Sequence, residues 1–312
     1  MIAIENIELL DSQVHKNMAI IPIKTPPSYK FDILTLKKGF ELGLVEVKEC
    51  EHSTVNTLIV KNHSVTPLLL VDGEEIIGGD QNRIVNATIL VAPESESKIP
   101  VNCTEHGRWG YKHEFKQSEY IATSRVRSSK EIASRSNLSA QQAVWDSIDE
   151  LEYSREFHSP TQAMSESYDN IKVDLDDALA HFSAVDGQSG VVVIIDGEIK
   201  GFELFFNSAI YKEFHGKILK SYLVDTDIND NIFTINTDTA KSLIESAITA
   251  EYVNKPSNGL EEVFEFENPE GLGKVYAYQD EVIHMSYFKN NTENTPKPNK
   301  AIDIIDEDAF RT

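Results

Sequence analysis

Residues 102–110, NCTEHGRWG, place a thiol, a carboxylate, an imidazole, a guanidinium and an indole within one short stretch. A surface loop does not need Cys103 or Trp109, and a core strand does not favour Glu105 and Arg108. The stretch is therefore typical either of a buried polar cluster that holds the fold or of a functional site. The choice between these two interpretations depends on what the fold brings beside it.

A second polar stretch, GGDQNR at residues 78–83, comes before the apolar, strand-like run at 86–93. A reversal of the chain after that run would bring residues 102–105 beside residues 80–83. The two polar stretches are therefore predicted to form a single pocket.

The side chains of this predicted pocket suit an anionic, nucleotide-like ligand. Arg83 and Arg108 carry guanidinium forks that match phosphate or carboxylate groups. Trp109 can stack on a base, which contributes about 1–3 kcal/mol per base. Gln81 and Asn82 can orient ribose hydroxyls or an amide. The pocket is predicted to bind a ligand through these five side chains.

Catalysis at this pocket would require a base or a nucleophile. Glu105 is the predicted general base, activating water at a glycosidic or phosphoester bond. Cys103 would be a nucleophile only if its pKa were lowered, and is otherwise a small residue of the core or of the pocket wall. The histidines follow no zinc-binding spacing, and GGDQNR lacks the terminal Gly-Lys-Ser/Thr of a phosphate-binding loop, so no metal and no cofactor is predicted.

The only dense basic patch of the sequence comprises Arg125, Arg127, Lys130 and Arg135. One interpretation makes Arg125 and Arg127 a wall or lid over the anionic ligand. The other makes the patch a solvated helix face that pairs with neighbouring acids.

The overall charge limits the partners of the chain. Its 312 residues include 51 acids and 29 bases, which gives a formal charge of −22. Such a surface repels nucleic acid and anionic membranes, so neither is predicted as a partner. No apolar run approaches the ~20 residues that cross a bilayer, and the N-terminus has no signal-peptide pattern. With only two cysteines, the protein is expected to be cytoplasmic with reduced thiols.

The order of apolar patterns predicts an α+β fold. Short strand-like runs fill residues 33–99, and helical patterns follow, one of them capped by Ser139. From residue 190, strands, helices and three further strands alternate. The expected fold has an antiparallel, β-rich N-terminal half, sandwich or barrel-like, and a second, smaller antiparallel sheet with helices in the C-terminal half.

The same patterns suggest a division of the chain. They predict a β-rich region at 1–115 that carries the site, a helical segment at 116–185, an α+β region at 186–290 and a mobile tail at 291–312. A single compact domain over 1–290 is the alternative. The runs LLLVDGEE and VVIIDGEI are alike, either through an internal repeat or because apolar-Asp-Gly-Glu is a common hairpin sequence.

Residues 73–93, 99–109 and 141–148 together resemble the ARG and rhodanese-phosphatase-superfamily-associated protein domain. That family has Gln-Asn-Arg, matched by residues 81–83, and then a Cys-x-Glu-x-Gly-Arg-Trp segment, matched by residues 103–109. A helix with Gln-x-x-Val-Trp follows, matched here by Gln141 or Gln142 and Trp145. The hairpin and helix from residue 190 also match, so the resemblance covers roughly residues 30–290.

This resemblance implies a role in processing NAD and ADP-ribose derivatives. The family is named for the ADP-ribosylglycohydrolases and rhodanese-phosphatases that neighbouring genes encode. Two positions depart from the family pattern. His106 stands where the family often has Gln, and Asp80 where it often has Lys or a small residue. A phosphate contact through residue 80 is therefore not implied.

The sequence predicts that the protein binds, and in one alternative hydrolyses, an ADP-ribose-type or NAD-derived nucleotide. A second alternative is a sensor or sponge that binds a nucleotide without turnover. A third is a protein-interaction module in which the polar stretches are structural. The sequence leaves the ligand, the turnover and the oligomeric state open, a homo-oligomer included.

Overall fold

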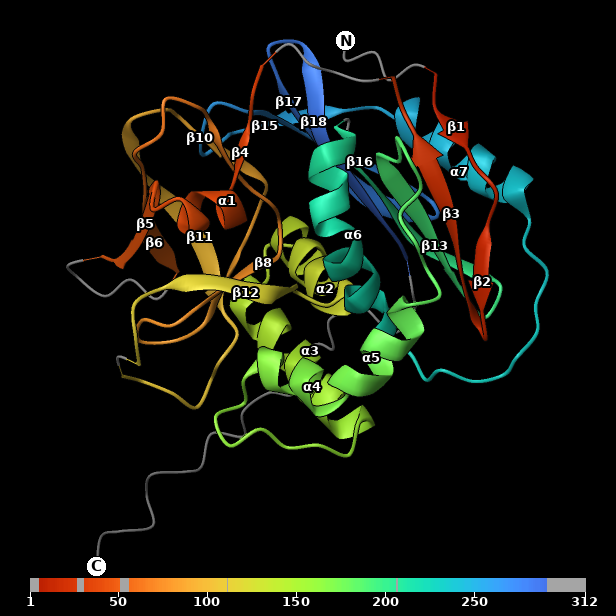
Figure 1. Ribbon diagram of the computed structural model, residues 1–312, viewed down its shortest axis with the longest axis horizontal. Helices are drawn as coiled ribbons and strands as arrows, with labels where there is room; N and C mark the ends of the chain where they lie inside the picture. The colour runs from red at the N-terminus through yellow and green to blue at the C-terminus, as the bar shows by residue number, and fades with distance from the viewer. Residues whose placement is uncertain (1–5, 27–30, 51–55, 111, 206, 291–312) are drawn as a thin grey trace, which may run out of the picture.

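The computed structural model describes residues 6–26, 31–50, 56–110, 112–205 and 207–290. Over these residues the chain forms seven helices and eighteen strands. The strands make three sheets, in which every pair is antiparallel except one. The structure confirms the predicted α+β class and the β-rich N-terminal half (Figure 1).

Two sheets enclose the core of the N-terminal half. The larger contains β5 (Val45–Glu49), β6 (Thr57–Asn62), β8 (Glu74–Ile77), β9 (Arg83–Val85), β11 (Ser95–Cys103) and β12 (Lys116–Ile121), in the order β12-β8-β9-β11-β6-β5. The smaller contains β4 (Leu34–Thr35), β7 (Leu68–Leu70) and β10 (Ile89–Val91), with α1 (Leu36–Glu41) following β4. Apolar side chains of both sheets share one core, so this half is sandwich-like.

The third sheet is larger than expected because strands from the N-terminus join it. Its strands are β1 (Glu8–Leu9), β2 (Gln13–His15), β3 (Met18–Lys24), β13 (Gly190–Ile195), β14 (Glu198–Leu204), β15 (Val253–Lys255), β16 (Glu262–Asn268), β17 (Gly271–Tyr278) and β18 (Glu281–Lys289). β3 pairs with β13 along its length, from Ile23↔Gly190 to Met18↔Ile195. The boundaries at 115 and 185 stay a prediction, although this pairing ties the N-terminus to the C-terminal region.

Helices cover both faces of this sheet, and the side chains of β13 pack against both of these layers. Val191 and Val193 pack in the core that contains α2 (Ser124–Arg135) and α6 (Ser208–Leu223), between the sheets. Val192 and Ile194 point the other way and pack with α7 (Thr237–Ile248). Alternate residues of a strand face opposite sides, so a continuous apolar run is what such a strand requires. Figure 1 shows α2 and α6 in the middle of the molecule and α7 outside.

The predicted helix after Ser139 is confirmed as α3 (Ala140–Ser154). The Ser139 side chain accepts a hydrogen bond from the Gln142 amide, and Val144, Ile148 and Leu151 are buried, as is Ala143. The helices α4 (Met164–Asn170) and α5 (Lys172–Leu179) follow. Asn236 caps α7, because its side chain accepts a hydrogen bond from the Thr239 amide.

The two Asp-Gly-Glu sequences have different structures. Asp196 and Gly197 have φ values of 53° and 80°, and they join the paired strands β13 and β14 as a tight hairpin. At Asp72 and Gly73, β7 and β8 belong to different sheets, so the chain crosses between sheets there. The explanation that Asp-Gly-Glu is a common hairpin sequence therefore holds only for residues 196–198. The predicted tail at 291–312 lies outside the described residues.

Candidate functional site

The two polar stretches meet, as the sequence predicted. β9 and β11 pair with Cys103 opposite Arg83 and Asn102 opposite Ile84. The pairing strand is β9 rather than the run at 86–93, of which residues 89–91 form β10 and pair with β7 in the other sheet. The reversal after that run brings β11 back along β9. We call Gln81, Asn82, Arg83, Cys103, Glu105 and Arg108 the polar cluster.

Arg108 is bonded to acceptors of the protein itself. Its terminal nitrogens donate to the carbonyl oxygens of Gly79 at 2.8 Å, Gly110 at 2.9 Å and Gly78 at 3.3 Å, to Asn82 Oδ1 at 3.2 Å and to Glu105 Oε2 at 2.6 Å. This arrangement ties the 78–82 segment to the 105–110 segment. The guanidinium thus makes the contacts expected of an internal clamp.

Glu105 is bonded through both carboxylate oxygens. Oε2 accepts from Arg108 and from the Asn82 amide at 3.2 Å, and Oε1 accepts from the Thr161 hydroxyl at 3.0 Å. Burial alone would raise the pKa of Glu105, but these donors outweigh burial and hold that pKa below its ordinary value. A carboxylate stabilised in this way is a weaker base than a free one.

The other predicted residues of the cluster are buried, and Trp109 is not. Gln81 donates to the Glu105 carbonyl oxygen at 3.2 Å, and Arg83 donates to the Asn82 carbonyl oxygen at 3.3 Å. Burial raises the pKa of the Cys103 thiol, the opposite of what activates a nucleophile. The Trp109 side chain lies outside this buried group, with 67% of its surface exposed.

Helix α3 holds the polar cluster from one side. The Gln141 side chain accepts from the Cys103 amide at 2.8 Å and donates to the Cys103 carbonyl oxygen at 2.9 Å. Gln142 instead bonds Asp146 near the surface. Gln141 is therefore the helix glutamine that pairs with the Cys-x-Glu segment. Trp145 stacks on His106, with ring centroids 4.1 Å apart.

The residues of the predicted basic patch point to different sides of α2. Arg127 is fully buried and donates to Glu203 through two hydrogen bonds, of 2.6 and 3.0 Å. Lys130 is also buried, pairs with Asp72 and donates to the Asn86 carbonyl oxygen at 2.7 Å. The interpretation as a solvated face is wrong for these two residues, because α2 lies between the sheets with that face inside.

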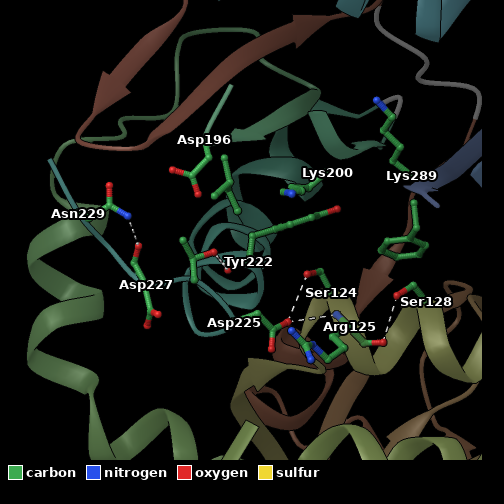
Figure 2. Close-up of a pocket in the computed structure, with 13 residues that line it drawn as sticks. Ser124, Arg125, Ser128, Asp196, Lys200, Tyr222, Asp225, Asp227, Asn229 and Lys289 are labelled. Atoms are coloured by element: carbon green, nitrogen blue, oxygen red, sulfur yellow. Dashed lines mark hydrogen bonds between the residues drawn. The ribbon is translucent and has the colours of Figure 1, made fainter. Parts of the chain in front are cut away.

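Arg125 points in a different direction and lines a polar cavity of about 470 Å³. Residues two positions apart on a helix do not share a face, which explains the separation from Arg127. The cavity is formed by the first turns of α2, the β13–β14 turn, the loop after α6 and the end of β18 (Figure 2). We call it the α2 pocket.

Three cationic and three carboxylate side chains line the α2 pocket: Arg125, Lys200 and Lys289, and Asp196, Asp225 and Asp227. Two of the cations already contact acids outside the lining. Arg125 lies 3.1 Å from Glu150, and Lys200 lies 3.0 Å from Glu198. Such partly exposed pairs contribute about 0–1 kcal/mol, so a ligand anion can share these cations at little cost.

Two side chains of the pocket have polar atoms without a partner among the described residues. Asp225 Oδ2 accepts from the Arg125 amide at 3.1 Å and the Ser124 hydroxyl at 3.3 Å, while Oδ1 is unpartnered. Burial raises the pKa of Asp225. The Tyr222 side chain is 1% exposed and its hydroxyl is also unpartnered. That hydroxyl lies over Gly201, where a Cβ atom would be 2.6 Å from it.

The sequence indicated Arg125 but not Lys200, Tyr222, Asp225 or Lys289. These residues are spread between positions 125 and 289, and only the crossing of α2, α6, β14 and β18 brings them together. Each stands at or near the end of an element, which is a weak signal. Local motif spacing therefore could not reveal this pocket.

Two further findings bear on function. Among the helices of the described residues, none has the length and apolar character needed to cross a bilayer. The described part of the chain also brings together no group of three or more His, Cys, Asp or Glu side chains that could hold a metal ion.

Comparison with known proteins places the chain in a family. Residues 6–288 match the ARG and Rhodanese-Phosphatase-superfamily-associated Protein domain, which the sequence motifs had suggested. No curated protein and no solved structure gives a significant match. Because the match spans nearly all of the described residues, the protein belongs to the ARG and Rhodanese-Phosphatase-superfamily-associated Protein domain family.

Proposed function

We propose that the protein binds an anionic, nucleotide-type small molecule of the ADP-ribose class in the α2 pocket. One observation carries this proposal. Arg125, Lys200 and Lys289 come from three separate elements and line one polar cavity, in a chain whose formal charge is −22. Against that overall field, a phosphate requires local cations of this kind.

The mixture of charges favours a sugar phosphate over a simple anion. A pyrophosphate can accept hydrogen bonds from the arginine and the two lysines. Ribose hydroxyls can donate to carboxylates, and Asp196 and Asp227 line the same cavity. The cavity of about 470 Å³ also lies within the range of about 300–1,000 Å³ that is usual for small-molecule sites.

The unpartnered Tyr222 hydroxyl supports a ligand at this position. A buried hydroxyl without a partner costs about 1–3 kcal/mol, and a bound polar group would remove that cost. Asp225 beside it caps the first turn of α2 through Oδ2 and leaves Oδ1 without a partner among the described residues. A bound polar group could donate to Asp225 Oδ1 and bond the Tyr222 hydroxyl in the same cavity.

The polar cluster has a structural role in this proposal. Arg108 and Glu105 bond each other and the backbone of the two segments that they join. Of the residues first predicted to bind ligand, Arg125 is the one we assign to direct contact. Arg127 does not line the cavity but packs against a residue that does. Its guanidinium lies 4.9 Å from the centre of the Phe288 ring, which lines the cavity.

The family supports the choice of the ADP-ribose class. The family's name refers to ADP-ribosylglycohydrolases, as the sequence resemblance implied, and the mixed charges of the pocket fit such a ligand. The same contacts would serve an enzyme or a sensor.

A capture experiment tests the proposal. The protein is incubated with NAD, ADP-ribose and cyclic ADP-ribose, separated quickly from free ligand, and both fractions are analysed by mass spectrometry. We expect one of these compounds, or its product, in the protein fraction. The Lys200→Ala/Lys289→Ala variant should lose it, and Lys112→Ala, an exposed change in the 105–115 loop, should retain it. A new product in the free fraction would identify an enzyme. Folded protein that retains nothing would contradict the proposal.

A further inference from the structure

A second cavity adjoins the α2 pocket. It has a volume of about 320 Å³ and shares Thr226 and Asp227 with the α2 pocket as lining residues. We call it the α5 pocket, because Asp174, Leu175 and Asp177 of α5 line it. In Figure 2, Asp227 lies at the left-hand end of the α2 pocket, the end away from Lys289.

The segment between the two cavities is held in a fixed position. Arg155 donates to the carbonyl oxygens of Val224 at 2.7 Å and Thr226 at 2.6 Å, and pairs with Asp227 at 3.3 Å. The Thr226 hydroxyl donates to the Tyr222 carbonyl oxygen at 2.8 Å. The short ridge formed by Thr226 and Asp227 is therefore braced from α3 and from α6, and it keeps the two cavities side by side.

The chemistry of the α5 pocket differs from that of the α2 pocket. Five of its twelve lining residues are apolar, among them Ile171, Leu175 and Ile228, and Lys16 and Arg155 also line it. Carboxylates of Asp174 and Asp177 stand beside them, together with the imidazole of His15. A cavity that combines apolar side chains with hydrogen-bond acceptors fits a planar heteroaromatic ring that carries an amino group.

His15 contributes a flat surface to this cavity. Its ring stacks on His181 with centroids 3.7 Å apart and planes 6° from parallel. Burial, then the neighbouring His181 and Lys16, lower the pKa of His15 below its ordinary value. A neutral imidazole can both accept and donate a hydrogen bond to a base.

We infer that the two cavities form one bipartite site for an elongated nucleotide. Its phosphates lie in the α2 pocket, its sugar crosses the Thr226–Asp227 ridge, and its base lies in the α5 pocket. This inference rests on the proposed function and narrows it. The ligand class is a nucleoside diphosphate derivative that carries a base, not a sugar phosphate alone.

The test compares a long probe with a short one on the full-length protein. Calorimetric titrations use two probes, ADP-ribose and ribose 5-phosphate, with the wild type and two variants. Ile228→Ala removes an apolar side chain from the lining of the α5 pocket, and Asp174→Ala removes an exposed acceptor. Val173→Ala is the matched control, because this α5 side chain is 81% exposed and does not line the pocket.

We expect the wild type to bind ADP-ribose about tenfold to a hundredfold more tightly than ribose 5-phosphate. Ile228→Ala should weaken ADP-ribose binding about tenfold and leave ribose 5-phosphate unchanged. Equal affinity for the two probes, or equal losses for both probes in Ile228→Ala, would overturn the bipartite site and leave the α2 pocket standing. Failure of folded wild type to bind either probe would overturn the proposed function as well.

Discussion

The guanidinium of Arg127 and the carboxylate of Glu203 form two hydrogen bonds, of 2.6 and 3.0 Å, in the buried layer behind the α2 pocket. Both side chains are fully buried, and His284 Nε2 lies 3.4 Å from Glu203 Oε2. The pair joins α2 to the nine-stranded sheet. It therefore fixes the two walls between which the α2 pocket forms.

Glu203→Gln should destabilise the protein, because it removes the carboxylate that pairs most closely with the buried Arg127 charge and leaves the longer contact, 3.8 Å, between Arg127 Nε and Asp72 Oδ2. The expected loss in free energy of unfolding at pH 7 is about 3–5 kcal/mol. Urea denaturation measures it, with Glu198→Gln as the surface control, for which about 0–1 kcal/mol is expected. Equal stability of the two variants would contradict the role assigned to the pair.

The same carboxylate predicts an acid limit to stability. Burial alone would raise the pKa of Glu203, but Arg127 and His284 outweigh burial and lower it to about 2. A group with a lowered folded pKa stabilises the fold above its unfolded pKa, and that contribution is lost as the pH falls toward 2. The free energy of unfolding should therefore fall by several kcal/mol between pH 5 and pH 2 in the wild type, and by less in Glu203→Gln.

Glu75 predicts the opposite dependence on pH. Burial raises its pKa to about 7, so the folded protein holds a proton that the unfolded chain has released. Its contribution is present below the unfolded pKa and is lost as the pH rises through 7. Glu75→Gln should therefore stabilise the protein by about 2–3 kcal/mol at pH 8 and by little at pH 4.5. Chemical denaturation at both pH values measures this. An equal change in the free energy of unfolding at both pH values, or the same pH-dependent change in the exposed Glu114→Gln variant, would contradict this prediction.

Arg108→Ala tests whether the polar cluster is structural. The change removes the donor that joins Gly79, Gly110 and Glu105, and it leaves a buried carboxylate without its cation. We expect a loss of about 3–5 kcal/mol in thermal or urea unfolding, with ADP-ribose binding retained by the fraction that folds. Lys112→Ala is the control. A fully stable Arg108→Ala protein that has lost the ligand would instead place the binding site at the polar cluster.

Tyr222→Phe separates binding from folding. The hydroxyl has no partner among the described residues, so its removal should leave the stability unchanged or slightly higher. A ligand that bonds this hydroxyl should bind about three- to tenfold more weakly. Thermal unfolding and ADP-ribose titration of the same preparation measure both quantities. Unchanged affinity would remove Tyr222 from the site.

The sequence predicted the elements that have strong local patterns and the meeting of the two polar stretches. Ser139 begins a helix because its side chain caps the Gln142 amide, and residues 81–83 meet residues 103–105 because the chain reverses between them. The sequence did not predict that α2 lies between the sheets. Buried Arg127 and Lys130 look like surface residues until their partners, Glu203 and Asp72, are known.

The α2 pocket could not be predicted from the sequence for the same reason. Lys200 and Lys289 are ordinary lysines in the sequence, and only the crossing of their strands with α2 places them in the same cavity as Arg125. Long-range pairing, such as that of β3 with β13, also enlarged the third sheet beyond expectation.

The most direct test of ligand binding in the α2 pocket is titration of ADP-ribose into the wild type and the Lys200→Ala/Lys289→Ala variant, at low and at moderate salt. We expect the wild type to bind, its affinity to fall as salt rises, and the variant, folded by circular dichroism, to lose at least about tenfold in affinity. Equal binding by both proteins, or none by the wild type, would contradict this expectation.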